Sequence, residues 1–380
     1  MKKVTIFKLA ELFCGPGGLS LGAMLSSVND LKNNSYKIKP VWANDIDENT
    51  CKTYANNIHN GDLKKISCSP VETINFEKVP SFDALAFGFP CNDFSVVGEQ
   101  RGFNGKYGPL YTYGVKAINI HNPKWFIAEN VSGLQSANNG NAFAKILKDL
   151  ESAGMGYRLT PHLYKFEDYG IPQTRHRVVI IGIRKDLDFE FKIPAPTTTH
   201  QYISAKEAIE NPPIPENAPN HEVTAQGEKV IERLKHIPPG ENAWYEGLPK
   251  HLRLNVKSAR MSQIYKRLHP DKPSYTLTGS GGGGTHGYHW KENRALTNRE
   301  RARIQTFPDS FIFEGSKESV RKQIGMAVPP KGARAIIEAV LKTFAGIDYK
   351  SIPSNIMTSN KIVEVNQERL FRYEPAIASL

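Results

Sequence analysis

Five apolar segments recur through the first 185 or so residues of the chain, and they constrain the fold more than any other feature. The segments are 5–13 (TIFKLAELF), 39–45 (KPVWAND), 82–89 (FDALAFGF), 124–130 (KWFIAEN) and 177–184 (RVVIIGIR). Amphipathic stretches lie between them, which predicts an α/β fold with a parallel sheet and helices on both faces. Several segments end in Gly, Asp, Cys or Glu, so polar side chains should gather at the strand ends where open α/β sheets bind ligands.

The amino-acid composition and the periodicity of the sequence change after about residue 190. Residues 191–290 are rich in proline and weakly periodic, and they close with the glycine run GSGGGGTHG at 279–287. Helical patterns return in 317–325 and 331–344, separated by a Pro-Pro pair that cannot continue the first helix. We therefore divide the chain into a larger domain at 1–190, a smaller irregular domain at 191–290, a return to the larger domain at 291–345, and a tail at 346–380.

Cysteine usage and hydropathy exclude several classes of protein. No segment approaches the roughly 20 apolar residues of a membrane span, so we expect a cytoplasmic protein. The four cysteines are scattered and lack the close pairing of a zinc site, so we expect reduced thiols and no metal. These cysteines are Cys14, Cys51, Cys68 and Cys91. One of them is therefore available as a nucleophile.

Positive charge is concentrated in one part of the chain. The formal net charge is +11, and residues 250–303 hold twelve Lys and Arg against three acidic residues. Such a block favours a polyanionic partner, because each neutralised phosphate releases condensed counterions. A solvated basic face explains the block equally well when it is taken alone.

A glycine-rich turn follows the first apolar segment. In ELFCGPGGLSLGA the chain passes from a strand through Gly15, Gly17 and Gly18 into a helix, so the backbone can approach a ligand closely. A tight structural turn is an alternative, because the spacing is not GxGxxG. Asp45 ends the second segment, where an acid accepts hydrogen bonds from ribose hydroxyls in dinucleotide folds. Together these residues indicate an adenosine-containing cofactor, and Asp62 in GDL is a candidate for its adenine edge.

Cys91 has unusual surroundings for a cysteine. It follows Pro90 at the end of an apolar segment and precedes NDFS, so it should sit where a loop leaves the ligand-binding edge. A buried cysteine is ordinarily a small hydrophobe, but a thiolate in a supporting environment is a strong nucleophile. The next segment brings Glu129 and Asn130 to the same edge, where Glu129 is either an ordinary ion-pair partner or a general acid.

Alternating polar residues precede the fifth apolar segment. In DYGIPQTRHRVVIIGIR, Gln173, Arg175 and Arg177 alternate in direction, so Arg175 and Arg177 should share one face. They are suited to holding an anion or a polar ring. A solvated strand start is the other interpretation.

Taken together, these motifs give a sequence that resembles the cytosine-C5 DNA methyltransferases. The resemblance covers about residues 9–345 and depends on six motifs in the family's order and spacing. The motifs are FCGPGG, PCNDFS, ENV, QTRHR, RALTNRERARIQTFPDSF and GMAVPP. Each motif alone is weak, but six in sequence are very specific. The resemblance implies a Rossmann-like S-adenosylmethionine-dependent sheet carrying a target-recognition domain, of the bacterial restriction-modification type.

The resemblance also assigns roles to the residues above. Cys91 would attack C6 of a cytosine flipped out of duplex DNA, and Glu129 would contact N3 and the exocyclic amine. Arg177 or Arg175 would hold the ring oxygen O2 and Glu129. Phe13, the glycines of the turn, Asp45, Asp62 and Pro90 would hold S-adenosylmethionine.

DNA contacts come from three further regions in this family. The resemblance places Ser95, Gln173, Thr276, Gly281 and Gly282 against double-stranded DNA, and we expect a monomer that is functionally paired with a restriction endonuclease. Two residues depart from the family pattern: Asn92 stands where Gln is common after the nucleophile, and Met326 stands where the final motif has Asn. The Met326 departure bears on cofactor affinity and rate.

Three alternatives differ in substrate or class. A tRNA cytosine methyltransferase would share the scaffold, but the long insert with its basic flank suits a DNA major groove better. A non-catalytic DNA-binding protein would have no need of Cys91, Glu129 and both arginines. A dinucleotide oxidoreductase fits least, because the glycine spacing is wrong and PCNDFS is left without a role.

Overall fold

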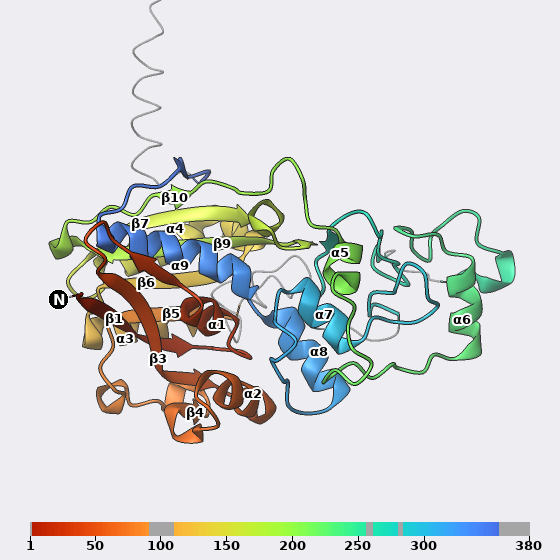
Figure 1. Cartoon of the computed structure of the whole chain (residues 1–380), viewed down its shortest axis with the longest axis horizontal. Helices are drawn as coiled ribbons and strands as arrows, with labels where there is room; N and C mark the ends of the chain where they lie inside the picture. The colour runs from red at the N-terminus through yellow and green to blue at the C-terminus, as the bar shows by residue number, and fades with distance from the viewer. Residues whose placement is uncertain (1, 91–109, 256–260, 280–283, 357–380) are drawn as a thin grey trace, which may run out of the picture.

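The computed structural model describes residues 2–90, 110–255, 261–279 and 284–356. Figure 1 shows a large sheet flanked by helices on one side of the molecule and a loop-rich part carrying α5 and α6 on the other. Helices α7 and α8 lie between these two parts in the view (Figure 1).

The larger part is built on an eight-stranded sheet. Its strands are β1 (Val4–Leu12), β2 (Ser27–Asn29), β3 (Ser35–Asp45), β4 (Ile66–Cys68), β5 (Ala84–Gly88), β6 (Trp125–Val131), β7 (Tyr157–Lys165) and β9 (His176–Arg184). The order is β2-β3-β1-β5-β6-β9-β7, with β4 also paired to β3. The first four predicted segments form the parallel strands β3, β1, β5 and β6.

The expectation of a parallel sheet is wrong for the fifth predicted segment, which forms strand β9. Strand β9 runs antiparallel to β6, and the unpredicted strand β7 runs antiparallel to β9. The apolar run at 177–184 is buried on both faces whichever way it runs, so hydropathy does not report its direction. The chain reaches β9 from β7 through a short connection, and such connections join antiparallel neighbours.

Alternating side chains of the strands build two cores. Phe7 and Leu9 of β1 point into one core together with helix α9, whereas Ala10 and Leu12 point into the other with α3 and α4. The helices are α1 (Gly18–Met24), α2 (Glu48–Ile58), α3 (Tyr111–His121), α4 (Asn141–Ser152) and α9 (Pro330–Ala345). Apolar burial on both sheet faces therefore fixes the register and presents all the parallel strand ends at one edge.

The smaller part has little regular structure. Its elements are α5 (Ala205–Glu210), α6 (Glu228–Lys235), the 3-10 turn η10 (Lys250–Leu252) and β11 (Ser274–Tyr275). Strand β11 pairs in parallel with β8 (Gln173–Thr174) and so ties this part to the larger one. Helices α7 (Asn298–Ile304) and α8 (Lys317–Met326) follow, and α7 begins with a capping box between Thr297 and Glu300.

Two segments near the predicted domain boundaries contact the larger part. Strand β10 (Ile193–Pro194) pairs with β12 (Ser351–Ile352), so the chain is still attached to the larger part beyond residue 191. Asn355 Oδ1 accepts a hydrogen bond from the amide of Leu163 at 2.8 Å. The described start of the predicted tail, up to residue 356, therefore packs on the larger part.

Several short 3-10 turns complete the described chain. They are η1 (Leu63–Lys65), η2 (Val71–Thr73), η3 (Phe76–Lys78), η6 (Ser132–Gln135), η7 (Ala137–Gly140), η8 (Phe166–Tyr169) and η9 (Lys185–Leu187). Within the described ranges, no helix combines the length and apolar character needed to cross a membrane.

Candidate active site

The glycine turn joins β1 to α1 at the carboxyl edge of the sheet. Phe13, Gly15 and Gly17 have positive φ angles of 53°, 54° and 100°. Three left-handed residues within five positions turn the chain sharply from strand to helix, and glycine adopts this conformation without steric cost. The amide of Gly15 donates a hydrogen bond of 2.9 Å to Oδ2 of Asp45, so the turn and the end of β3 are joined directly.

The glycines of this turn differ in what surrounds them. A Cβ on Gly15 would meet no atom within 4 Å, whereas one on Gly17 would lie 3.0 Å from Ile58 and Tyr54. A Cβ on Gly18 would lie 2.1 Å from the carbonyl oxygen of Val328. Gly17 and Gly18 therefore permit close packing, and Gly15 faces open space where the backbone can approach a bound molecule. This arrangement fits an adenosine-containing cofactor held at the end of β1.

Asp45 and Asp62 both accept hydrogen bonds from backbone amides. Asp45 accepts from the amides of Gly15 and Asp47 through different oxygens, and each carboxylate oxygen can accept a second bond from a ribose hydroxyl. Burial raises the pKa of Asp45, although these backbone hydrogen bonds lower it in part. Asp62 lies in the loop between α2 and β4, where its side chain accepts from the amide of Lys64.

Two residues near this edge were not expected from the sequence. Ile46 follows Asp45 directly, and its side chain is 69% exposed. Glu11 is fully buried beneath the turn, where Tyr54 donates to its carboxyl at 3.3 Å and Ser20 also bonds to it. The sequence feature that could have predicted a buried Glu11 is its position as a lone acidic residue within an apolar segment.

Glu129 and Arg177 form an ion pair at the edge beside β5. Arg177 Nε lies 3.0 Å from Glu129 Oε1, and both side chains are largely buried. Burial raises the pKa of Glu129, and the positive charges of Arg177 and Arg175 oppose that rise. A Cβ on Gly88, which pairs with Glu129 across the sheet, would lie 3.2 Å from Glu129 Oε2. The glycine leaves one face of the carboxyl group open.

The backbone that leads to Cys91 is fixed by Asn130. Its side-chain amide is buried and donates to the carbonyl of Phe89 at 3.1 Å. Pro90 follows and is half-buried. Cys91, Asn92 and Ser95 lie outside the described residues. The described backbone therefore delivers the chain to Cys91 from the strand next to Glu129.

Arg175 differs from Arg177 in position and contacts. Its side chain is buried and donates to the carbonyl of Ala327 at 3.0 Å, while its Nε and one terminal nitrogen have no hydrogen-bond partner within the described part of the chain. Arg177 contacts Glu129 and Arg175 reaches the segment after α8, so the two guanidinium groups take different partners. Met326, beside Ala327, is 63% exposed.

The expected DNA-contacting residues divide into three groups. Gln173 is fully buried, and its amide bonds to Gln305 and to the amide of Leu277, so it joins β8 to β11 and α7. Thr276 is half-buried, and its hydroxyl donates to the carbonyl of Thr174 at 2.6 Å. Gly281 and Gly282 lie outside the described residues. Gln173 is therefore buried from solvent, whereas Thr276 is partly exposed.

Much of the basic block serves the protein interior. Arg267 donates to the carbonyls of Leu234, Ile237, His289, Trp290 and Glu292. Arg294 pairs with Glu292 and Glu300, and Arg303 pairs with Asp309. These arginines tie loops with little regular structure to one another. The charge available to a polyanion is smaller than the sequence count indicates.

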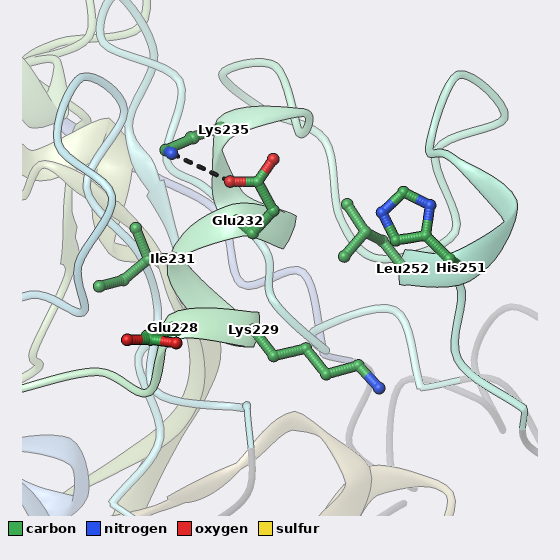
Figure 2. A pocket seen from close by; sticks show the side chains of 7 residues that line it. All are labelled: Glu228, Lys229, Ile231, Glu232, Lys235, His251 and Leu252. Atoms are coloured by element: carbon green, nitrogen blue, oxygen red, sulfur yellow. Dashed lines mark hydrogen bonds and ion pairs between the residues drawn. The ribbon is translucent and has the colours of Figure 1, made fainter.

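Two hollows lie in or beside the smaller part. An open pocket of about 520 Å³ between α6 and η10 includes Glu232, which pairs with Lys235 at 2.9 Å (Figure 2). A second hollow of about 560 Å³ borders Thr174 and Thr276 and is lined by Lys266 and Lys272. The second hollow is the one adjacent to the expected DNA-contacting residues. Among the described residues, no group of three His, Cys, Asp or Glu side chains is placed to hold a metal ion.

The fold is Rossmann-like and is shared with solved methyltransferases. A crystal structure of a DNA modification methyltransferase encoded within a prophage of E. coli matches with a TM-score of 0.68 and 22% identity, covering 89% of this chain and 99% of that one. The Entamoeba histolytica methyltransferase EhMeth matches with a TM-score of 0.57 and 15% identity, covering 90% and 98%.

Sequence comparisons assign the family. The model of the C-5 cytosine-specific DNA methylases matches residues 7–342. The type II methyltransferase M.BbvI of Brevibacillus brevis is 58% identical over 372 residues, covering 95% of this chain and 99% of the relative. M.NgoFVII of Neisseria gonorrhoeae, another type II methyltransferase, is 40% identical over 89% of this chain and 87% of its own length. The chain belongs to the C-5 cytosine-specific DNA methylases, and it is a DNA (cytosine-5-)-methyltransferase.

Proposed function

We propose that the protein methylates C5 of a cytosine flipped out of duplex DNA, within one short sequence, through a covalent bond between Cys91 and C6. The methylation would protect DNA from a cognate restriction endonuclease. The observation that carries the proposal is the Arg177–Glu129 pair. Its Glu129 lies on β6, the strand next to β5, which leads toward Cys91. Membership of the family supplies the substrate class.

The proposed chemistry begins with addition to the ring. The Cys91 thiolate attacks C6, a sulfur–carbon bond forms, and a proton from Glu129 to N3 balances the electron pair that moves into the ring. Carbon 5 would become nucleophilic and take the methyl group from a sulfonium donor, which would leave as the neutral thioether. N3 would return its proton to Glu129. A base then removes the C5 proton, the C5–C6 double bond re-forms, and the sulfur–carbon bond breaks to release the thiolate.

Its burial and its ion pair with Arg177 suit Glu129 to the role of proton donor. Burial favours the protonated carboxyl, and Arg177 limits the rise in pKa so that the group can both give and regain a proton. Arg177 would also hold the ring oxygen O2. We retain Arg175 as a positioning residue, because its contact with Ala327 links the strand start to the segment after α8.

S-adenosylmethionine would supply an electrophilic methyl group on a sulfonium centre. Phe13, Gly15, Gly17 and Gly18 would surround it, with Pro90 lining the pocket. Asp45 would accept from the ribose hydroxyls and Asp62 would contact the adenine edge. The open space at Gly15 and the exposed side chain of Ile46 support this assignment.

Duplex DNA would lie between the two parts of the molecule. Ser95, Thr276, Gly281 and Gly282 would contact the duplex, with Thr276 near the backbone of the flipped nucleotide. Gln173 would hold Thr276 in place through the β8–β11 pairing. The hollow beside Thr276, with Lys266 and Lys272, supports a path for the phosphate backbone. The residues of the smaller part, roughly 191–290, would read the target sequence, and the enzyme would act as a monomer in the cytoplasm.

Bisulfite sequencing of DNA from cells that express the protein tests the proposal. We expect cytosines in one short sequence to resist conversion, and we expect the Cys91→Ser protein to leave the same sites unprotected. Full conversion of the DNA in cells that contain folded protein would reject the proposal. Resistance that persists with Cys91→Ser would reject the role of the cysteine and keep the methylation itself.

A further inference from the structure

Two arginines with little compensating charge meet where α7 and α8 contact the smaller part. Arg301 of α7 is 3% exposed, and its guanidinium makes no hydrogen bond to another described residue. Arg321 of α8 has a buried Nε without a partner among the described residues, and one of its terminal nitrogens contacts the ring of His286. Burial and the nearby Arg321 lower the pKa of Arg301, which falls to about 10.

The surrounding acids do not neutralise this pair. Glu300 is occupied by Arg294 and by the backbone amide of Thr297. Glu318 lies 3.7 Å from Arg321, but its side chain is 86% exposed. Burial and the two arginines lower the pKa of His286 to about 4, so this histidine is neutral near pH 7 and adds no third charge. The contact between α7, α8 and the smaller part therefore concentrates positive charge without a buried acidic side chain to neutralise it.

Neighbouring arginines show what a structural arginine looks like in this protein. Arg299, on the same helix as Arg301, donates to the carbonyls of Pro219, Pro308 and Phe311. Arg267 is bonded to carbonyl groups in the same way. Arg301 is as deeply buried as these residues and has no such bonds. A buried guanidinium nitrogen without an acceptor is costly, and Arg321 Nε is such a nitrogen, so an external anion at this site would be stabilising.

Close backbone packing fixes the position of the two arginines. A Cβ on Gly325 would lie 2.1 Å from the amide nitrogen of Gly279, so α8 lies directly against the segment that follows Thr276 and Leu277. Arg321 is one helical turn before Gly325 and lies on the same face of α8. Its guanidinium is thereby held beside the chain that continues from Thr276.

We propose that Arg301 and Arg321 form a binding pocket for one phosphodiester group of the DNA strand that passes Thr276. The inference rests on the proposed function and extends it by naming a phosphate site. The planar fork of arginine matches phosphate oxygens in bidentate geometry, and two forks in a partly dry pocket hold one phosphate in a defined place. Such an interaction carries no sequence information but fixes the register of the duplex.

The test is the salt dependence of DNA binding by the full-length protein. Methylation mapping first gives the target sequence, and a short fluorescent duplex with that sequence is titrated at several KCl concentrations with S-adenosylhomocysteine present. The variants are Arg321→Gln and Arg301→Gln. The control is Lys185→Gln, which removes an exposed cation paired with Glu151.

We expect each arginine variant to bind more weakly and with a less steep log–log salt slope, by up to about 0.9, the value for one neutralised phosphate. Arg321→Lys should restore most of the slope, because it keeps the charge. Lys185→Gln should match the wild type. Replacing one phosphate near the target with a neutral methylphosphonate should weaken the wild type and leave Arg321→Gln unaffected.

Two results would overturn the pocket. One is a folded Arg321→Gln protein whose slope equals that of the wild type. The other is a methylphosphonate scan in which every substitution affects wild type and variant equally. Failure of the proposed function is seen separately, as the absence of methylated cytosine in the mapping step. If Arg301→Gln does not fold, Arg321→Gln alone decides the question, because its side chain is less deeply buried.

Discussion

Arg177 Nε lies 3.0 Å from Glu129 Oε1, and the two residues are diagonal neighbours on antiparallel strands. Arg177 pairs with Val131 in the register of β6 and β9, while Glu129 pairs with Val179. Side chains two positions apart on one strand share a face, so the register directs both groups to the same side of the sheet. The reversal of β9 is what brings the arginine to the end of β6.

Removal of the arginine should move the pKa of Glu129. Burial raises this pKa and Arg177 lowers it, so Arg177→Gln should raise it further. If protonated Glu129 is the acid in the proposed reaction, the alkaline limb of the rate profile should shift to higher pH. We also expect the rate at the optimum to fall about 100-fold, the usual scale for a positioned acid or base.

The pH profile of single-turnover methylation measures this effect. Arg177→Lys should keep the limb near its wild-type position, because it retains the charge. An unchanged limb in Arg177→Gln would show that a group other than Glu129 controls the profile.

A methyl group at Gly15 should block cofactor binding without disrupting the fold. Gly15→Ala places its Cβ in open space at a φ of +54°, and the strain should cost about 1 kcal/mol of stability. Gly346→Ala is a matched control, because Gly346 has a φ of +66° and also has no atom near its Cβ. Calorimetry with S-adenosylmethionine should show at least tenfold weaker binding for Gly15→Ala alone. Equal affinity in both folded variants would remove Gly15 from the site.

Cys91 should form a trapped complex with a fluorinated target. A cytosine with fluorine at C5 can accept the thiolate and the methyl group but has no proton to lose there, so the protein should remain attached in a denaturing gel. Cys91→Ser should neither trap nor turn over, since an alcohol is a far weaker nucleophile near neutral pH, yet it should still bind DNA. Cys14→Ser, Cys51→Ser and Cys68→Ser should all trap. Recovery of a different cysteine in the crosslink would contradict the assignment.

Glu11 should make stability depend on pH in a defined direction. Burial raises its pKa from the ordinary 4.5 to about 8, although hydrogen bonds from Ser20 and Tyr54 lower it in part. The folded state therefore holds a proton that the unfolded chain releases, and the contribution to stability is complete below pH 4.5. It is lost as pH rises toward 8, with a slope of up to about 1.4 kcal/mol per pH unit.

Urea unfolding of Glu11→Gln at several pH values tests this dependence. The uncharged amide cannot ionise, so the decline between about pH 4.5 and 8 should be smaller than in the wild type. Glu72→Gln, which alters an exposed acid, should leave the decline unchanged. Parallel curves for wild type and Glu11→Gln would show that Glu11 is ionised in the folded protein.

The sequence determined the parallel half of the sheet and the residues at its edge. Apolar segments at 5–13, 39–45, 82–89 and 124–130 became β1, β3, β5 and β6, because burial on both faces requires such runs. Their polar ends, including Asp45 and Glu129, follow from the same segments. Position along a strand is a local property, so local sequence predicts it.

Tertiary structure decided which charged residues act together. Arg175 and Arg177 lie two positions apart, yet one bonds to Ala327 and the other to Glu129, because Arg177 belongs to β9 whereas Arg175 lies in the link between β8 and β9. The basic block shows the same dependence. Arg267 donates hydrogen bonds to carbonyl groups, while the side chain of Arg301 makes no hydrogen bond to a described residue. A charge in sequence has no fixed partner until folding brings distant chain segments together and removes water from around it, and only then does its burial decide whether it is structural or free to bind an anion.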